Sequence, residues 1–218
     1  MTTRHRRGSQ LRTLARLLLF AVLWWLVVVR IIRQLYKFPI PEFMAPVIDN
    51  PLRRRIQPPD GLAARHGLEP GMQVLEVGPG SGAYTMAAAR RVGDSGRVTA
   101  IDIEPKMIAR ITARAQAENA HNVEAQLADV YALPFDTGSF DAIFMVTVIG
   151  EIPEPGRAMR ELYRVLAPSG TLAFSELLLD PDYPLPRTLV NLAQAAGFRL
   201  KQKSGNILAY TVVFEKEP

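Results

Sequence analysis

The pattern of apolar and polar residues changes twice along the chain. Residues 17–29 form an unbroken apolar run, residues 38–61 contain six prolines, and short apolar runs recur from residue 73 onward. Prolines at that density exclude a long helix, because proline lacks the N–H group that a helix needs. The pattern therefore predicts a basic arm with a hydrophobic helix at 1–37, a proline-rich linker or lid at 38–66 and a folded domain at 67–218.

Within this domain, strand-like and helix-like patterns alternate. Strands are predicted at 73–77, 97–102, 123–128, 140–146, 170–176, 198–203 and 207–215, and helices at 59–66, 82–92, 105–119, 154–167 and 187–196. Such alternation favours a doubly wound, Rossmann-like α/β fold. The last two strands follow each other directly, which is typical of a hairpin. The predicted sheet thus has seven strands, mostly parallel, with a terminal antiparallel hairpin.

Composition and charge narrow the possible chemistry. The chain has no cysteine, which removes disulfides, thiolate metal sites and cysteine nucleophiles. Its three histidines are scattered, so no metal site is predicted. Residues 1–55 carry a net charge of +9 and the remainder −4. A mildly acidic body does not indicate nucleic-acid binding, whereas basic residues around an apolar run suit anionic lipid headgroups.

The apolar run at 17–29 predicts attachment to membrane lipids through residues 11–37. Thirteen helical residues extend about 20 Å, whereas a bilayer core is about 30 Å thick. A short span and a helix lying at the membrane surface therefore both stay open, with the folded domain expected in the cytoplasm. No signal-peptide cleavage site follows the run. Arg53-Arg54-Arg55 is expected either to touch headgroups or to form a solvated basic face.

A glycine-rich turn follows the first predicted strand. Gly78, Gly80 and Gly82 stand at every second position before a helix, where a backbone without Cβ atoms can approach a nucleotide-like ligand closely. The same residues fit the pattern of dinucleotide-binding proteins, with Ala83 as the last position, and that of S-adenosylmethionine (SAM) enzymes. The glycines alone leave both cofactors open.

Two carboxylates after the next strands favour SAM. Asp102 ends the second strand, where an acid can accept both ribose hydroxyls of either cofactor. Asp129 follows the third strand, where a carboxylate can accept a hydrogen bond from the exocyclic amine of adenine. Nicotinamide enzymes have no standard need for that second acid.

The stretches VLEVGPGSGAYT, VTAIDIEPKMI, ADVYALPFDTGSFDAIFMV, AMRELYRVLAPSGTLAFSE and AAGFRL occur in this order. Over roughly residues 67–218 the chain resembles the class I SAM-dependent methyltransferases. The resemblance implies SAM as cofactor and a role for each matching residue. It places Glu76, Gly78, Gly80 and Gly82 at the methionine end, Asp102 on the ribose, Ile103 beside the adenine, Asp129 with Val130 at the adenine amine and ring, and Thr147 near the transferable methyl.

Two acids are candidate catalytic bases. Glu151 and Glu176 each follow the carboxyl end of a predicted strand, the edge at which open α/β sheets bind ligands. Many members of the family carry a histidine shortly after the fourth strand, and Glu151 occupies about that place. Glu151 could instead cap the helix near residue 154, and Glu176 could pair with a surface arginine.

These expectations combine into a methyltransferase that acts at a membrane on a lipophilic small molecule, namely a lipid amine, a quinone-type ring or a thiol. A lid would come from residues 38–66 and the loop 178–187. Arsenite methylation is disfavoured, since it relies on cysteines. A membrane-tethered SAM-binding protein without turnover and an NAD(P)-dependent oxidoreductase stay open as alternatives. The sequence does not indicate the oligomeric state.

Overall fold

The chain forms two compact units, Met1–Phe38 and Pro39–Pro218. The computed structural model describes residues 13–14, 16–18, 20–21, 24, 27–33 and 50–216. Those described in the first unit are helical, and their exposed side chains include Leu17, Phe20 and Trp24. Among the described residues, no helix is long and apolar enough to cross a membrane. A spanning helix over 17–29 is therefore not confirmed, and residues 19, 22, 23, 25 and 26 of that run lie outside the described part.

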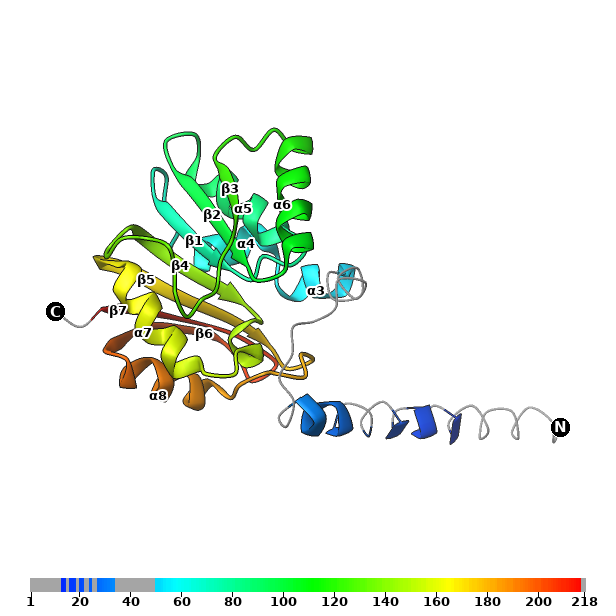
Figure 1. The fold of residues 1–218 in the computed structure, drawn as a ribbon. Coiled ribbons are helices and arrows are strands. Elements are labelled where there is room, and N and C mark those ends of the chain that lie inside the picture. The colour runs from blue at the N-terminus through cyan, green and yellow to red at the C-terminus, as the bar shows by residue number, and fades with distance from the viewer. Residues whose placement is uncertain are drawn as a thin grey trace. The chain divides into compact units, whose positions relative to one another are not determined.

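The second unit is built on a seven-stranded sheet with the strand order β3-β2-β1-β4-β5-β7-β6 (Figure 1). Strands β1 to β5 pair in parallel, and β7 runs antiparallel to both of its neighbours. The predicted α/β sheet and terminal hairpin are thus confirmed. The strands are β1 (Gln73–Val77), β2 (Arg97–Asp102), β3 (Val123–Leu127), β4 (Phe140–Val146), β5 (Leu166–Leu177), β6 (Phe198–Gly205) and β7 (Ala209–Lys216).

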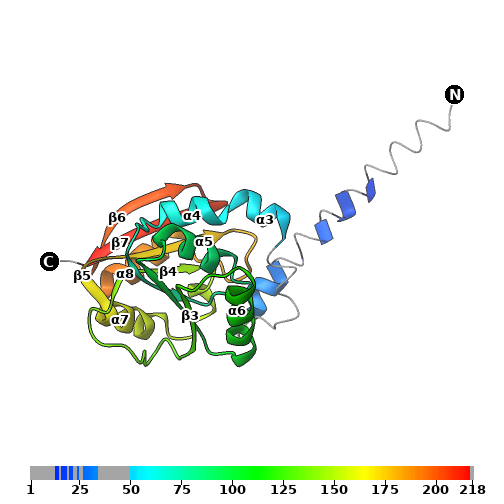
Figure 2. The ribbon, with the colours of Figure 1, turned by 90° about the horizontal axis from the view of Figure 1, so that it is seen from above.

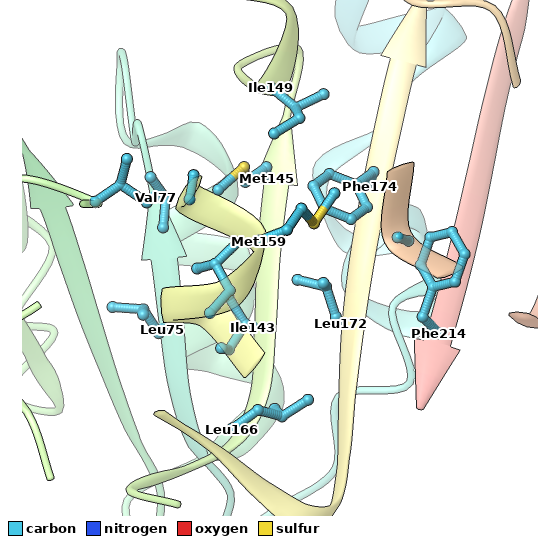
Figure 3. Close-up of a cluster of buried hydrophobic side chains, with 14 of the residues drawn as sticks. Leu75, Val77, Ile143, Met145, Ile149, Met159, Leu166, Leu172, Phe174 and Phe214 are labelled. Carbon is cyan, nitrogen blue, oxygen red and sulfur yellow. The ribbon is translucent and has the colours of Figure 1, made fainter. Parts of the chain in front are cut away.

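Helices cover both faces of this sheet (Figure 2). One face carries α4 (Pro59–Arg65), α5 (Ala83–Val92) and α6 (Pro105–Ala117), and the other carries α7 (Pro155–Val165) and α8 (Pro186–Ala195). Successive residues of a strand point to opposite faces, so both residue sets of a central strand must be apolar. In β4, for example, Ile143 and Met145 pack on the side of α7, whereas Phe144 packs on the side of α4. Figure 3 shows the first of these cores around Met159 of α7.

The chain reverses its direction of sheet growth beside β1. From β1 it proceeds outward through β2 to β3 and then returns to β4 on the other side of β1. In open α/β sheets, ligands bind beyond the carboxyl ends of the strands at such a switch point. The fold therefore directs attention to the segments that follow β1, β2, β3 and β4.

The start of β5 differs most from the sequence expectation. Helix α7 ends at Val165, and β5 begins directly at Leu166 rather than near residue 170. Leu166 pairs with Phe140, after which the register shifts so that Ala142 pairs with Thr171. This irregularity leaves extra residues on the β5 side, so the proline and glycine of this stretch fit within one continuous strand.

The segment that precedes β1 packs onto the sheet. It contains α3 (Pro51–Ile56) and α4, each with proline in its first turn. His66 caps the end of α4, lies buried against the Phe144 ring and is joined to Ser175 of β5, with 2.8 Å between His66 Nε2 and Ser175 Oγ. This contact fixes the end of α4 over the middle of the sheet, and α3 lies immediately before it.

Candidate functional site

The turn between β1 and α5 brings the backbone to the switch point. Gly78 has a positive φ of 73°, and a Cβ there would lie 2.5 Å from Cγ2 of Val148, in the segment after β4. Gly80 also has a positive φ, of 54°, but a Cβ there would meet no described atom within 4 Å. Glycine at Gly78 is thus required by packing inside the protein. At Gly80 it leaves the backbone open to a ligand.

Glu76, two residues before this turn, is buried in an unusual state. Its side chain is 2% exposed, and within the described residues its Oε2 atom has no hydrogen-bond partner. Burial raises the pKa of the Glu76 carboxyl to about 8. A buried carboxyl with an unpaired oxygen lowers the stability of the fold, so its presence calls for an explanation such as a ligand. It suits a cationic group of a ligand, which would stabilise the charged form.

Asp102 and Asp129 lie after neighbouring strands. Oδ1 of Asp102 accepts a hydrogen bond from Glu104 N at 2.9 Å, and burial raises the pKa of this carboxyl. Oδ1 of the exposed Asp129 accepts one from Tyr131 N, also at 2.9 Å. A backbone hydrogen bond from Ala128 N to the carbonyl of Asp102 holds the two turns side by side. Each acid thus holds the turn that follows its strand in shape.

Two apolar residues accompany these acids. Ile103 follows Asp102 and is 56% exposed, and Val130 follows Asp129 and is buried. An exposed isoleucine beside the acid at the end of β2 can offer an apolar surface to a flat ring. The sequence-predicted residues Glu76, Asp102 and Asp129 therefore come from three adjacent strands and meet along one edge of the sheet.

Thr147 lies at the carboxyl end of β4 in a strained conformation. Its φ is 55°, in the left-handed region that a β-branched residue rarely adopts. Its amide donates to the carbonyl of Ser175, and its hydroxyl oxygen accepts a hydrogen bond from Arg53 Nη2 at 2.5 Å. Such strain costs of the order of 1–3 kcal/mol and occurs preferentially at functional sites.

Arg53 was misjudged from the sequence, which suggested a headgroup contact or a solvated face for all three consecutive arginines. In the structure Arg53 is 9% exposed, while Arg54 and Arg55 are exposed. The burial arises from a contact with Thr147, 94 residues further along the chain. A run of like charges gives no sign of such a contact. The one available signal is the presence of a second polar residue, Gln57, one helical turn later.

The two candidate bases differ in their surroundings. Glu151 is half-buried in the short 3₁₀ helix η2 (Ile149–Glu151). Glu176 is 1% exposed at the end of β5, and within the described part of the chain its Oε1 has no hydrogen-bond partner. Burial raises the pKa of Glu176 well above its usual range, and Asp180 adds to the rise, whereas Arg53 opposes it. The suggested pairing of Glu176 with a surface arginine is therefore wrong.

No group of three or more metal-ligating side chains occurs among residues 50–216 or in the described helical residues before them. The candidate site combines the open backbone at Gly80, the buried Glu76 carboxyl with its unpaired oxygen and the acids Asp102 and Asp129. Arg53 and Glu176 form a further group of buried charged side chains.

The sequence of this chain is similar to those of known methyltransferases. Residues 75–174 match the family model described as a methyltransferase domain. The chain is 31% identical over 147 residues to a ubiquinone/menaquinone biosynthesis C-methyltransferase from Idiomarina loihiensis, covering 66% of this chain and 56% of that one. It is 32% identical over 117 residues to an arsenite methyltransferase from Halobacterium salinarum, covering 54% and 30%. The chain thus spans about a third to a half of the length of these relatives.

Solved structures share the fold. A SAM-dependent methyltransferase from Aquifex aeolicus superimposes with a TM-score of 0.75 at 24% identity, covering 81% of this chain and 98% of that one. The family match and the curated relatives indicate SAM rather than a nicotinamide cofactor. This chain belongs to the class I SAM-dependent methyltransferases.

Proposed function

We propose that the protein transfers a methyl group from SAM to a lipophilic small molecule with a quinone-type ring. The main observation that supports SAM as the methyl donor is the buried Glu76 with its unpaired oxygen, shortly before the open backbone of Gly80. Glu76 and the turn at Gly78–Gly82 would hold the cationic methionine end. Asp102 would hold the ribose, and Asp129, with Ile103 and Val130, the adenine.

The donor supplies, when bound, a methyl group on a cationic sulfur, which leaves with the electron pair of the broken carbon–sulfur bond. Because that leaving group is good, alignment of the acceptor can provide much of the catalysis. Thr147 would orient the reacting end. Glu176 would accept the proton that the acceptor loses, and the half-buried Glu151 is the second candidate for this role.

The acceptor class is supported by relatives and by the surface of the protein. Several curated relatives are, by name, C-methyltransferases of ubiquinone and menaquinone biosynthesis. The absence of cysteine argues against the arsenite chemistry of another relative. The exposed apolar side chains of the first unit, including Leu17 and Trp24, support membrane association. The catalytic unit would then lie on the cytoplasmic side.

The proton state of Glu76 provides a first prediction. Its pKa is raised from 4.5 to about 8, so the carboxyl is neutral at neutral pH in the free protein, and a bound cation would lower this pKa. Binding of SAM near neutral pH is therefore expected to release a proton, and the affinity should rise with pH until about 8. Calorimetric titration in buffers of different ionisation enthalpy measures the proton release.

The same raised pKa sets the sign of a stability effect. In the free protein, the contribution of Glu76 to stability is fully present below its unfolded pKa of 4.5 and is lost as the pH rises through about 8. Glu76→Gln, which cannot ionise, should lose both this dependence and the proton release attributable to the protein. An unchanged proton release in Glu76→Gln would show that the proton comes from the ligand instead.

The function itself is tested with isotopically labelled SAM and reduced 1,4-naphthoquinone as acceptor. We expect the purified protein to form a C-methylated product, identified by mass spectrometry. A phosphatidylethanolamine vesicle and an aliphatic thiol serve as parallel acceptors. Transfer to the amine or the thiol alone would contradict the ring as acceptor, and SAM binding without any product would favour a binding protein without turnover.

A further inference from the structure

Helix α3 exposes its apolar side chains and buries polar ones, the opposite of an ordinary surface helix. Its apolar residues Leu52 and Ile56 are 60% and 37% exposed, whereas the polar Arg53 and Gln57 are 9% and 2% exposed. Arg53 and Gln57 are four residues apart and therefore share one side of the helical turn. A surface helix ordinarily buries its apolar stripe. The reversal indicates that α3 covers a polar region of the protein.

Some hydrogen-bonding atoms on the polar side of α3 have no partner within the described chain. Arg53 donates from Nη2 to Thr147 Oγ1, and its guanidinium lies 6.0 Å from the centre of the Tyr84 ring. Within the described chain, Arg53 Nε and Gln57 Oε1 are buried without a hydrogen-bond partner. An arginine that only stabilises the fold would normally have its buried donors paired. The unpaired donor therefore points to a ligand.

Glu176 belongs to the same region, because it follows Ser175, whose carbonyl accepts a hydrogen bond from the Thr147 amide. Its carboxyl is buried, also has an unpaired oxygen, and is close enough to Arg53 for the two charges to influence each other. Arg53 comes from α3 and contacts Thr147 directly, whereas Glu176 comes from the end of β5, next to the residue that accepts from the Thr147 amide. The strained Thr147 thus has a buried cation and a buried acid near it, both with unused hydrogen-bonding atoms.

We propose that Arg53 is the acceptor-recognising residue of this enzyme and binds an acidic oxygen of the methyl acceptor, as in a phenol, an enol or an aromatic carboxylate. The inference rests on the proposed methyl transfer and narrows its substrate. The planar guanidinium matches an oxygen anion and pairs strongly with it in a buried site. A protonated lipid amine would instead meet a buried positive charge. Arg53 therefore selects hydroxylated rings over amines.

The test measures acceptor binding apart from catalysis. The probe is 1-hydroxy-2-naphthoate, a ring with acidic oxygens, titrated into the full-length protein saturated with S-adenosylhomocysteine. Arg53→Gln is expected to weaken binding of the probe about 10- to 100-fold, the usual effect of losing hydrogen bonds to a charged group. Arg53→Lys should restore part of the affinity. Affinity for S-adenosylhomocysteine should stay unchanged, which also shows that the variant is folded.

Arg55→Gln is the matched control, since it removes the same charge from an exposed position of the same helix. It should bind the probe like the wild type. Equal weakening in both variants would show that only the net charge matters, and it would overturn the proposal. Unchanged binding in Arg53→Gln, or no binding by the wild type, would overturn it as well. Failure of methyl transfer to the naphthoquinone, with probe binding intact and dependent on Arg53, would instead contradict the proposed acceptor alone.

Discussion

Gly78→Ala is expected to lower the free energy of unfolding by about 2–5 kcal/mol and to abolish measurable SAM binding. A residue with a side chain costs about 1–2 kcal/mol in the left-handed region, and the φ of Gly78 is 73°. Overpacking adds typically 1–3 kcal/mol, because the new Cβ would lie 2.5 Å from Val148. Relief of that clash must displace the turn or the segment after β4. Urea unfolding and calorimetric titration with SAM measure the two effects.

Gly67→Ala separates the strain from the clash. Gly67 has nearly the same φ, 75°, but a Cβ there would meet no described atom within 4 Å. It should therefore cost about 1–2 kcal/mol, the strain alone, and leave SAM affinity intact. Equal losses of stability in the two variants would mean that the contact between Gly78 and Val148 does not constrain the turn.

Glu176→Gln is expected to reduce the rate of methyl transfer about 10²- to 10⁴-fold, the usual contribution of a general base. The amide has the shape of the carboxyl but cannot take up a proton. Because burial raises the pKa of Glu176 well above its usual range, the wild-type rate should fall with decreasing pH, and the fall should begin at a higher pH than for an ordinary carboxyl. The residual rate of Glu176→Gln should lack this dependence. Single-turnover measurements with labelled SAM over a pH series give both results.

Glu124→Gln provides the control for this variant. Glu124 lies on β3, its side chain is 53% exposed, and it pairs with Arg97 at 3.1 Å. Its loss should leave the rate and the pH profile unchanged. A Glu176→Gln variant with the wild-type rate would remove Glu176 from catalysis and leave Glu151 as the candidate base.

The donor side could be predicted from the sequence because its signals are local. The turn at Gly78–Gly82 and the acid Asp102 are each defined by a strand end and the few residues after it. A parallel sheet then brings successive strand ends to one edge without further information. The hairpin of β6 and β7 could also be predicted from the sequence, since two strand patterns follow each other directly.

The acceptor side could not be predicted in the same way. The burial of Arg53 depends on its contact with Thr147 and on the docking of His66 against Ser175, contacts that span 94 and 109 residues. Local composition gave only a basic run. The start of β5 was missed for a related reason, because the pairing of Leu166 with Phe140 outweighs the local effect of the following proline and glycine.

The reversed direction of β7 has a practical consequence. Strands β1 to β5 leave the sheet at the site edge, whereas β7 enters there, with Tyr210 opposite Glu176. It then leaves at the far edge, where Glu215 pairs with Thr171 near the start of β5. A fluorophore or an immobilisation tag joined after Lys216 would therefore project from the end of the sheet remote from the chemistry. Surface-coupled binding measurements can be made in that orientation without obstructing the site.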